Sequence, residues 1–437
     1  MKKYMRIHVG RSVALIAGLL VFGAQVQAAR SAQEQKAARS EVENPDSTEA
    51  YPKKRSSRSG WERVVSFPGR IIYLPLKIVF KGGSGLAGWV DDSKIIPKTV
   101  DFLTSDDGKR GLYPTYSSRS GAGVKFFQKD LFTEGSRFQM KATVGLRSRQ
   151  LYEIYLKRVR LFGSPVCGEI RGRYRMLSDE NFFGIGPETI DGDKSNFAHE
   201  RVEALASLSA ELGARVNLGL QFGFDHNNIL PGHDKSLPST TDLFTRDTLP
   251  GMETEIRMGW AGLVLQYDSK NRMGNPSTGA EAMIRGDLYR EVDDDRFGFW
   301  RATVDLTRYL HLFYNRVLVF RIASEMTESL SDREVPFFYL SEFGSQETIR
   351  GYDRGRFRDN DLILGSVEYR YPIWQRMDAI LFFDAGKVAP DMFDDLSKGD
   401  LQYAYGGGFR IWSGEGLVMR IELGKGLDKF RFHFNLN

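Results

Sequence analysis

The chain is 437 residues long and carries a net charge of +5, with 12% aromatic residues, 45 glycines and one cysteine. That cysteine, Cys167, cannot form an internal disulfide, and the mild charge without a basic cluster argues against nucleic-acid binding. Beyond the N-terminus, no stretch approaches the ~20 apolar residues of a membrane-spanning helix. A membrane location therefore requires a closed β-barrel, because only helices and barrels pair every backbone polar group in lipid.

The N-terminus has the pattern of a secretory signal peptide. Lys2 and Lys3 open a positively charged start, an apolar run occupies residues 13–22, and small residues end the segment at Val26-Gln27-Ala28. The apolar run is too short to span a membrane. We therefore expect residues 1–28 to be removed on export.

Two further segments precede the main part of the chain. Residues 29–58 are polar and compositionally biased, which is typical of a disordered tail. Residues 59–108 contain the apolar stretch 71–80 and a Gly-rich break at 82–85. They form either an amphipathic segment at the inner membrane interface or barrel mouth, or an ordered linker. We expect this short extension to lie in the periplasm.

Apolar and polar residues begin to alternate near residue 109. In the segment 298–310 two sets of residues occupy opposite faces: Trp300, Ala302, Val304 and Leu306 against Arg301, Thr303, Asp305 and Thr307. The same period of two recurs in 361–373, 416–425 and 429–437. Such a pattern is typical of a barrel strand that turns one face to lipid and the other to a water-filled lumen.

Sixteen segments of this kind are present, and an even number is what a closed antiparallel bacterial barrel needs. They span 109–117, 121–130, 136–147, 150–162, 166–177, 197–210, 213–225, 256–268, 279–290, 298–310, 315–327, 361–373, 377–388, 401–412, 416–425 and 429–437.

The connections between these segments sort by length. The short joins 163–165, 374–376 and 413–415 fall on one side, and the long joins 178–196, 226–255 and 328–360 fall on the other. Short periplasmic turns and long outer loops are typical of outer-membrane barrels.

A soluble β-sandwich is the main alternative fold. It would also alternate, but it would rarely hide Arg and Glu on so many strands. The sequence therefore predicts an all-β fold, a 16-stranded antiparallel transmembrane β-barrel over residues 109–437, in the bacterial outer membrane.

Three short motifs in the last third of the chain resemble those of the BamA/TamA family of outer-membrane barrels, which includes the two-partner secretion transporters. The motifs are Ile349-Arg350-Gly351-Tyr352 in the connection 328–360, Glu368 in the segment 361–373, and Phe382, Asp384 and Gly386 in the segment 377–388. The turn Asn275-Pro276-Ser277-Thr278-Gly279 resembles the family's inner turn before the ninth strand.

This resemblance implies that the long outer loop folds back into the lumen. Its tip, Ile349 to Tyr352, would dock on the other two motifs, with Arg350 forked between the carboxylates of Glu368 and Asp384. Glycine at 351 permits a tight turn, and glycine at 386 removes a side chain where the loop approaches.

The family usually carries periplasmic POTRA modules of about 75 residues, with a β-α-α-β-β pattern. No such pattern is visible in residues 29–108, so the chain resembles the POTRA-less branch. Because those modules normally receive clients, the resemblance is less informative about substrate capture.

The resemblance implies insertion or translocation of proteins at the outer membrane. The family's proposed mechanism needs a weak seam between the first and last strands, and Pro114 in the first segment removes a ladder donor. The alternatives are a gated channel for small solutes or lipids, with 328–360 as its plug, and a structural surface-antigen barrel. An Arg-rich lumen would favour anions in a channel.

Catalytic and cofactor chemistry are not expected. The sequence has no HExxH or Gly-x-Ser-x-Gly motif, and the run Asp293-Asp294-Asp295 is interpreted as a solvated loop rather than a metal site. His433 faces the lumen by parity, which argues against a phospholipase. Expected partners are outer-membrane lipids, lipopolysaccharide and unfolded outer-membrane or secreted proteins, bound by a monomeric barrel.

Overall fold

The structure is a computed structural model, and the part of the chain that it describes begins at residue 105. It covers residues 105–436 apart from short gaps at 118, 162–163, 253–254, 273, 375, 396–398, 400 and 413–416. The predicted signal peptide (1–28), the predicted tail (29–58) and residues 59–104 of the predicted linker lie outside the described residues.

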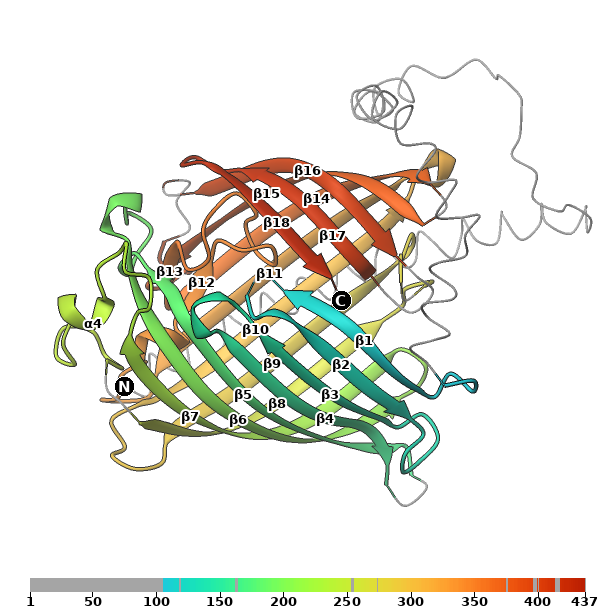
Figure 1. Ribbon diagram of the computed structural model, residues 1–437, viewed down its shortest axis with the longest axis horizontal. Helices are drawn as coiled ribbons and strands as arrows, with labels where there is room; N and C mark the ends of the chain where they lie inside the picture. The colour runs from blue at the N-terminus through green and yellow to red at the C-terminus, as the bar shows by residue number, and fades with distance from the viewer. Residues whose placement is uncertain are drawn as a thin grey trace, which may run out of the picture. The chain divides into compact units, whose positions relative to one another are not determined.

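Sixteen antiparallel strands close into a barrel, in which each strand pairs with its neighbours along the chain and β1 pairs with β18 (Figure 1). This confirms the predicted sixteen-stranded fold. The barrel strands are β1 (Arg110–Ser117), β2 (Gly121–Lys129), β3 (Arg137–Val144), β4 (Gln150–Arg160), β5 (Val166–Phe182), β6 (Ser195–Leu212), β7 (Val216–Pro231), β8 (Ile256–Asp268), β9 (Gly279–Glu291), β10 (Gly298–His311), β11 (Val317–Ser329), β14 (Asp361–Trp374), β15 (Met377–Ala389), β16 (Gln402–Trp412), β17 (Leu417–Lys425) and β18 (Phe430–Leu436).

The remaining elements lie in the connections. They are the short strands β12 (Ser341–Phe343) and β13 (Phe357–Asp359), the helix α4 (Thr240–Leu243), and the 3₁₀ turns η1 (Leu146–Ser148), η2 (Asp191–Asp193), η3 (Phe313–Asn315) and η4 (Phe337–Tyr339). Among the described residues, no helix is long and apolar enough to cross a membrane.

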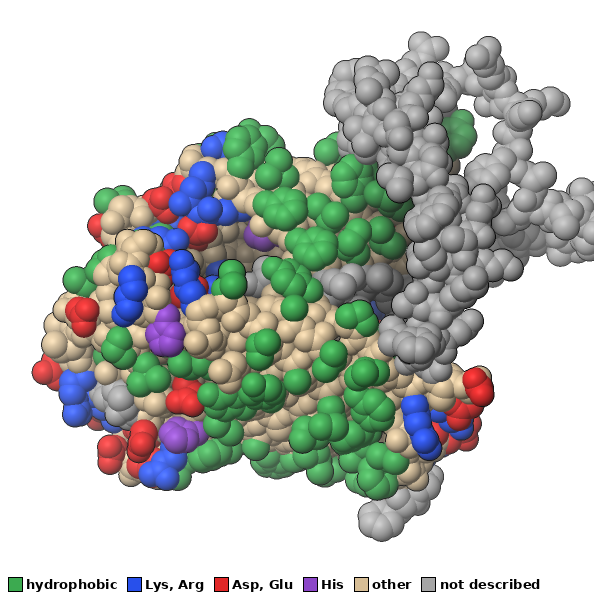
Figure 2. Space-filling view, viewed as in Figure 1, with side chains coloured by type: hydrophobic (Ala, Val, Ile, Leu, Met, Phe, Trp, Pro, Cys, Tyr) green, Lys and Arg blue, Asp and Glu red, His purple; other side chains and the backbone are tan. Residues whose placement is uncertain are grey.

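The apolar positions of the alternating pattern face outward. On β7, the side chains of Leu218, Leu220, Phe222 and Phe224 are exposed, whereas Asp225, of the opposite parity, is buried inside the barrel. Figure 2 shows the apolar side chains as a broad band over the strands, with charged side chains gathered at the two ends of the band. A lipid environment accounts for apolar side chains on the outside and charged side chains on the inside, because lipid stabilises exposed apolar surface and does not stabilise charge.

Three strands extend further outward than the sequence indicates. β5 continues to Phe182, β6 starts at Ser195, and β7 continues to Pro231, so the connections expected at 178–196 and 226–255 shorten to 183–194 and 232–255. Phe182, Phe197 and Ile229 on these extensions pack in one apolar cluster with Leu249 of the connection 232–255 and Phe337 of the connection 330–360. Contacts between residues distant in sequence therefore lengthen these strands.

The seam that closes the barrel is short. Among the described residues, β1 pairs with β18 through Tyr116 with Leu436 and Ser117 with Asn435. By contrast, β1 pairs with β2 along its whole length, from Arg110 to Ser117. Figure 1 shows β1 beside only the end of β18.

Exchanging a lipid-facing residue tests the assignment of faces. Replacing Leu220 with Arg places a charge in lipid, and we expect it to lower the free energy of unfolding in vesicles by about 2–4 kcal/mol. Gln221→Arg, the neighbouring lumen-facing control, should have a much smaller effect. Urea titration followed by tryptophan fluorescence measures both, and equal losses would contradict the assigned faces.

Candidate functional site

The connection between β11 and β14 folds into the lumen of the barrel. Its strands β12 and β13 form a hairpin, with Phe343 opposite Phe357. Four residues of the connection pack with four lumen-facing barrel residues in one buried cluster: Phe343, Ile349, Tyr352 and Phe357 with Leu362, Leu364, Val388 and Ala404. The predicted insertion of this loop is therefore what the structure shows, and apolar burial anchors it against the wall.

Arg350, at the tip of this loop, is surrounded by three carboxylates. Its Nε and Nη2 atoms donate to the two carboxylate oxygens of Asp384 at 2.8 and 2.7 Å. Its Nη1 donates to Glu368 Oε2 at 2.8 Å and to Glu422 Oε1 at 2.9 Å. Arg350 is 3% exposed and Asp384 is fully buried, so water screens these charges little.

Further groups contact Arg350 and its partner Asp384. The guanidinium carbon lies 3.6 Å from the centre of the Phe382 ring, which allows a cation–π contact. Ser366 Oγ donates to Asp384 Oδ1 at 2.6 Å, and the backbone amide of Arg350 donates to Asp384 Oδ2 at 3.2 Å. The planar fork of arginine, rather than a point charge, suits this arrangement.

Further arginines surround the three carboxylates. Arg420 Nη2 donates to Glu422 at 2.7 Å and to Glu368 at 3.2 Å. Arg370 Nε donates to the other oxygen of Glu368 at 2.8 Å, and Arg410 Nη1 lies 4.0 Å from the same oxygen. With Arg350, four guanidinium groups thus face three carboxylates, and their mutual attraction offsets the desolvation cost of burying so many ions.

Glycines allow the loop to approach the wall. A Cβ atom added at Gly351 would lie 2.3 Å from the backbone nitrogen of Gly426, and one added at Gly424 would lie 2.4 Å from the carbonyl oxygen of Arg350. A Cβ atom at Gly386 would meet Ile349 Cδ1 at 3.3 Å and a backbone oxygen at 2.5 Å. His433 Nε2 donates to the carbonyl oxygen of Arg350 at 2.8 Å.

The structure brings all eight residues of the predicted motifs together. Ile349 is fully buried in the apolar cluster. The Tyr352 hydroxyl donates to the carbonyl oxygen of Tyr403 at 3.2 Å and accepts from the amide of Leu427 at 3.1 Å. Their placement therefore matches the docking that the resemblance implies.

Sequence reasoning did not identify Glu422 on β17 as a partner of Arg350. Arg350 reaches it across β16, whose lumen-facing residues at this level are Ala404, Gly406 and Gly408. A Cβ atom at Gly406 would lie 2.6 Å from Phe382 Cζ, so side chains at this level of β16 would block the path from Arg350 to Glu422. The run Gly406-Gly407-Gly408 inside a strand was the available signal.

The loop has a second anchor on another part of the wall. The Tyr339 hydroxyl donates to Asp225 Oδ2 at 2.8 Å, and Arg201 Nη2 donates to the same oxygen at 2.7 Å. Arg201 also lies 5.2 Å from the centre of the Tyr339 ring. Because β6 and β7 hold this anchor and β14, β15 and β17 hold Arg350, the loop is fixed at two separate places.

The turn before β9 enters the same network from the opposite end of the barrel. Asn275 Nδ2 donates to Asp378 Oδ2 at 2.7 Å. Arg370 Nη1 approaches Asn275 Oδ1 at 3.4 Å, while its Nε binds Glu368. The outer loop and the inner turn are therefore connected through Arg370 and Glu368.

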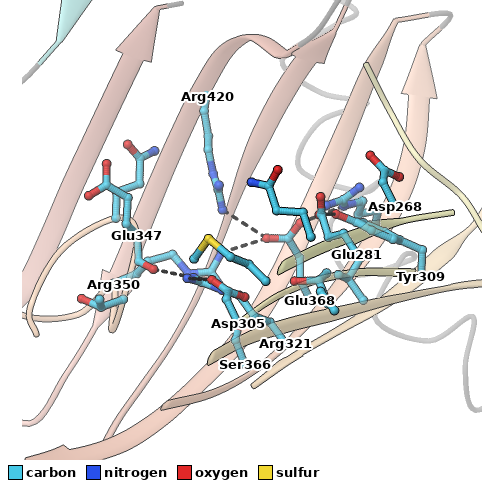
Figure 3. Close-up of a pocket in the computed structure, with 18 of the residues that line it drawn as sticks. Asp268, Glu281, Asp305, Tyr309, Arg321, Glu347, Arg350, Ser366, Glu368 and Arg420 are labelled. Carbon is cyan, nitrogen blue, oxygen red and sulfur yellow. Dashed lines mark hydrogen bonds and ion pairs between the residues drawn. The ribbon is translucent and has the colours of Figure 1, made fainter. Parts of the chain in front are cut away.

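Beneath the loop tip lies a polar cavity of about 720 Å³. Figure 3 shows Arg350 and Arg420 converging on Glu368, with Asp305 and Arg321 nearby. Arg321 Nη2 is paired with Asp305 at 2.7 Å. Such a lining suits water or polar groups and not an apolar ligand.

The acidic turn at residues 293–295 is exposed, as expected of a solvated loop, and two of its carboxylates are also ion-paired. Asp293 binds Arg257 Nε at 2.7 Å. Asp295 binds Arg333 Nη2 at 2.6 Å and Arg290 Nε at 2.8 Å. Hydrogen bonds from Arg333 and Arg290 hold the pKa of the Asp295 carboxyl well below its usual range. These ion pairs therefore join β8, the turn before β10 and the connection 330–360 at one end of the barrel.

Removing the guanidinium of Arg350 tests whether it holds the loop tip. In a Cys167→Ser background, Gln346→Cys reports the exposure of the tip to a membrane-impermeant maleimide. We expect Arg350→Ala to accelerate labelling at least about tenfold, because breaking a buried ion pair costs roughly 3–5 kcal/mol. Arg354→Ala is the matched control, since Arg354 makes only a longer pair with exposed Glu347 at 3.5 Å. Equal labelling rates in both variants would show that Arg350 does not hold the tip.

The link between the inner turn and the loop tip makes a second prediction. Asn275→Ala removes the hydrogen bond to Asp378, worth roughly 1.5–3 kcal/mol for a charged acceptor. We expect it to raise labelling at Gln346→Cys by a smaller factor than Arg350→Ala, and the double variant to be non-additive. Ser277→Ala, in the same turn but bonded locally to Asn271, is the control. Strict additivity would mean that the turn and the tip are independent.

A family model described as the Omp85 superfamily domain matches residues 117–437. Among solved structures, the chain is similar to BamA from Haemophilus ducreyi, in a form lacking POTRA domains 1–3. The TM-score is 0.54 at 15% identity, over 74% of this chain and 69% of that one. This likeness concerns the fold.

Two further solved structures are CdiB from Acinetobacter baumannii, at 12% identity and a TM-score of 0.45, and CdiB from Escherichia coli, at 11% and 0.49. Each match covers 74% of this chain, and 58% and 62% of the respective CdiB chains. No curated protein matches the sequence. The match over residues 117–437 confirms the resemblance inferred from the loop-tip and docking motifs: the chain belongs to the Omp85 superfamily and is a barrel of the bacterial outer membrane.

Proposed function

We propose that this barrel inserts or translocates proteins at the outer membrane by opening the seam between β1 and β18. The observation that carries the proposal is the shortness of that seam, which joins Tyr116 and Ser117 to Leu436 and Asn435. Every other neighbouring pair of barrel strands is joined along a longer ladder.

Among the described residues, opening the seam breaks fewer backbone hydrogen bonds than opening any other pair of neighbouring barrel strands. Because lipid offers no substitute partner, each broken hydrogen bond is costly there, so the barrel opens with the least loss where the ladder is shortest. Pro114 has no N–H and cannot extend the ladder along β1. The rings of Tyr116 and Phe434 also meet across the seam, with their centres 5.5 Å apart.

An unpaired strand edge in lipid recruits a partner. Arg110, Gly111, Leu112 and Pro114 of β1 lie beyond the described ladder to β18, and lipid supplies no substitute for a missing strand partner. An incoming unfolded strand would satisfy them by β-augmentation, in which backbone hydrogen bonds give affinity and alternate side chains give specificity. A client entering this way would grow from the edge of β1.

A gated channel is the second candidate function, because a polar cavity lies directly beneath the latched loop tip. In this role the loop would be a plug and Arg350 its latch. Release of the tip would then connect the cavity to the outside and raise conductance in planar bilayers.

The same proposal extends to the lipids, clients, oligomeric state and location of the barrel. The apolar band would contact outer-membrane lipids and lipopolysaccharide, and the clients would be unfolded outer-membrane or secreted proteins. The barrel would act as a monomer and without catalytic chemistry, and the segment before β1 would lie in the periplasm.

Locking the seam tests the proposed function. In a Cys167→Ser background, Ser117→Cys and Asn435→Cys lie at directly paired positions, whose spacing in a sheet suits a disulfide. We expect this variant, under oxidising conditions, to deplete a subset of other outer-membrane or secreted proteins, as measured by quantitative proteomics. The control is a disulfide between Asn217→Cys and Gln266→Cys on β7 and β8, which are paired along their length.

Reduction of the disulfide should restore the missing proteins if the seam must open. An unchanged protein inventory with a fully oxidised seam would contradict the proposal. In that case, increased conductance of Arg350→Ala in planar bilayers would support the channel instead.

A further inference from the structure

The turn between β10 and β11 places an arginine on the lipid-facing side of the barrel. Val317 and Val319 of β11 pack with Tyr309, which lines the lumen cavity. Arg316 immediately precedes β11, and its backbone is extended (φ −81°, ψ 148°), so the alternation of the strand continues through it. Arg316 therefore shares the outer face of the strand with Phe320, which is exposed.

This turn lies at the end of the barrel where the short connections gather. Residues 312–316 join β10 to β11, as 213–215 and 375–376 join other strands at the same end. In outer-membrane barrels the short turns face the periplasm, and a girdle of aromatic side chains lies there at the level of the lipid headgroups. Arg316 therefore lies at the depth of the headgroups of the inner leaflet.

Three aromatic rings surround the guanidinium group of Arg316. Its central carbon lies 4.8 Å from the centre of the Tyr371 ring, 5.2 Å from that of Phe313 and 5.6 Å from that of Tyr314. Tyr371 comes from the neighbouring strand β14, whereas Phe313 and Tyr314 come from the turn itself and meet edge to face. Cation–π attraction from these rings fixes the position of the arginine side chain.

The turn has a backbone conformation that one of its residues rarely adopts. Tyr314 and Asn315 have φ angles of 56° and 57°, in the left-handed region. Two such residues in succession are characteristic of a type I′ hairpin turn, which favours Asn and Gly. Asn315 suits this turn, but a bulky residue such as Tyr314 is strained there. The strained position is the one that places a ring against Arg316.

Two nitrogen atoms of Arg316 are buried without an acceptor. The residue is 8% exposed, and its Nε and Nη1 atoms have no hydrogen-bond partner. Arg321 on the same strand, by contrast, donates to Asp305 inside the lumen at 2.7 Å. Aromatic rings attract the cation but do not satisfy its N–H groups, and a buried charged donor without an acceptor is costly. The site therefore requires an oxygen anion from outside the described chain.

The surroundings of Arg316 also favour an anion. The turns on either side carry Arg272 and Arg376, and both are exposed. An exposed carboxylate at this end, Asp268, is paired with Lys270 at 3.3 Å. Clusters of basic side chains beside a membrane attract anionic lipid headgroups.

We propose that Arg316 and its three rings bind the headgroup phosphate of a phospholipid in the inner leaflet. The phosphate supplies the acceptor that the guanidinium lacks, and hydrogen bonds between charged groups are the strong ones. The ring of Tyr314, which is 59% exposed, is the wall of the site that can turn aside to admit the lipid. The acyl chains of the same lipid would lie along Phe320 and Ile322, which are exposed on the outer face of β11.

A phospholipid fits this site better than a free phosphate ion. In Arg350 the fork onto one carboxylate uses Nε and Nη2. The unpartnered atoms of Arg316 are Nε and Nη1, whose N–H groups point in different directions and therefore need acceptors in two places. A phospholipid offers its phosphate oxygens and, a few atoms away, the carbonyl oxygens of its acyl esters.

Native mass spectrometry of the full barrel in detergent, titrated with phosphatidylglycerol, tests the inference. We expect Arg316→Gln to weaken the tightest binding event at least about tenfold, because a charged donor is lost. Arg215→Gln removes the same charge from an exposed residue of the turn between β6 and β7 at the same end, and it should leave that event within about twofold. Diacylglycerol with the same chains, which lacks the phosphate, should not compete for the site.

A second variant keeps the arginine and alters its surroundings. Tyr314→Asn removes one ring of the site and relieves the turn, because Asn adopts the left-handed conformation more readily. We expect it to lower the affinity for phosphatidylglycerol by about threefold, the size of an exposed cation–π contact. If Arg316→Gln does not fold, as judged by its migration on gels with and without heating, Tyr314→Asn carries the test.

Each other outcome overturns a part of the inference. Equal affinities of Arg316→Gln and Arg215→Gln for phosphatidylglycerol would overturn the site. Diacylglycerol that competes as well as phosphatidylglycerol would show that the acyl chains and not the phosphate are bound. Displacement of the lipid by an equal concentration of inorganic phosphate would assign the site to a free anion and overturn the phospholipid. Because β10 and β11 lie away from β1 and β18 in the ring, none of these outcomes bears on the seam.

Discussion

Lipid offers no hydrogen-bonding partner to a backbone, and this constraint governs the whole chain. Sixteen strands meet it by pairing in a closed ring, and their outward side chains are apolar because they contact hydrocarbon. Among the described residues, the ring meets the constraint least well between β1 and β18, where two residue pairs are formed. The shortest strand pairing of the described barrel is therefore also the place where we propose that clients enter.

Inside the ring, by contrast, the lumen admits water and charged side chains. Arg350 can be buried because three carboxylates surround it, and Arg370, Arg410 and Arg420 pair with those carboxylates in turn. Such a cluster contributes specificity of position more than net stability. Through Glu368 and Arg370 it also connects the outer loop to Asn275 in the inner turn. A disturbance at one end of the barrel thus has a physical route to the other.

The lumen is not electrically uniform. Around β14 to β17 the arginines beside the loop tip, Arg350, Arg370 and Arg420, each meet a carboxylate. On β3 and β4, by contrast, Arg137 and Lys157 lie opposite each other on the lumen side. The ion pairs of Arg350 hold the loop on the first of these surfaces, and the hydrogen bond of Tyr339 holds it at Asp225.

The sequence by itself determined the strand count and the inward and outward faces, because a period of two is a property of contiguous residues, and the eight motif residues could be recognised in it from their resemblance to the BamA/TamA family. It did not reveal Glu422 as a partner of Arg350, the contact of Asn275 with Arg370, the longer β5 to β7, or the two-pair seam. These depend on the stagger of strands around the ring and on a loop packed inside it. The alternating pattern shows which face of a strand a residue occupies. Only the closed barrel determines which residues of different strands lie at the same height in the lumen.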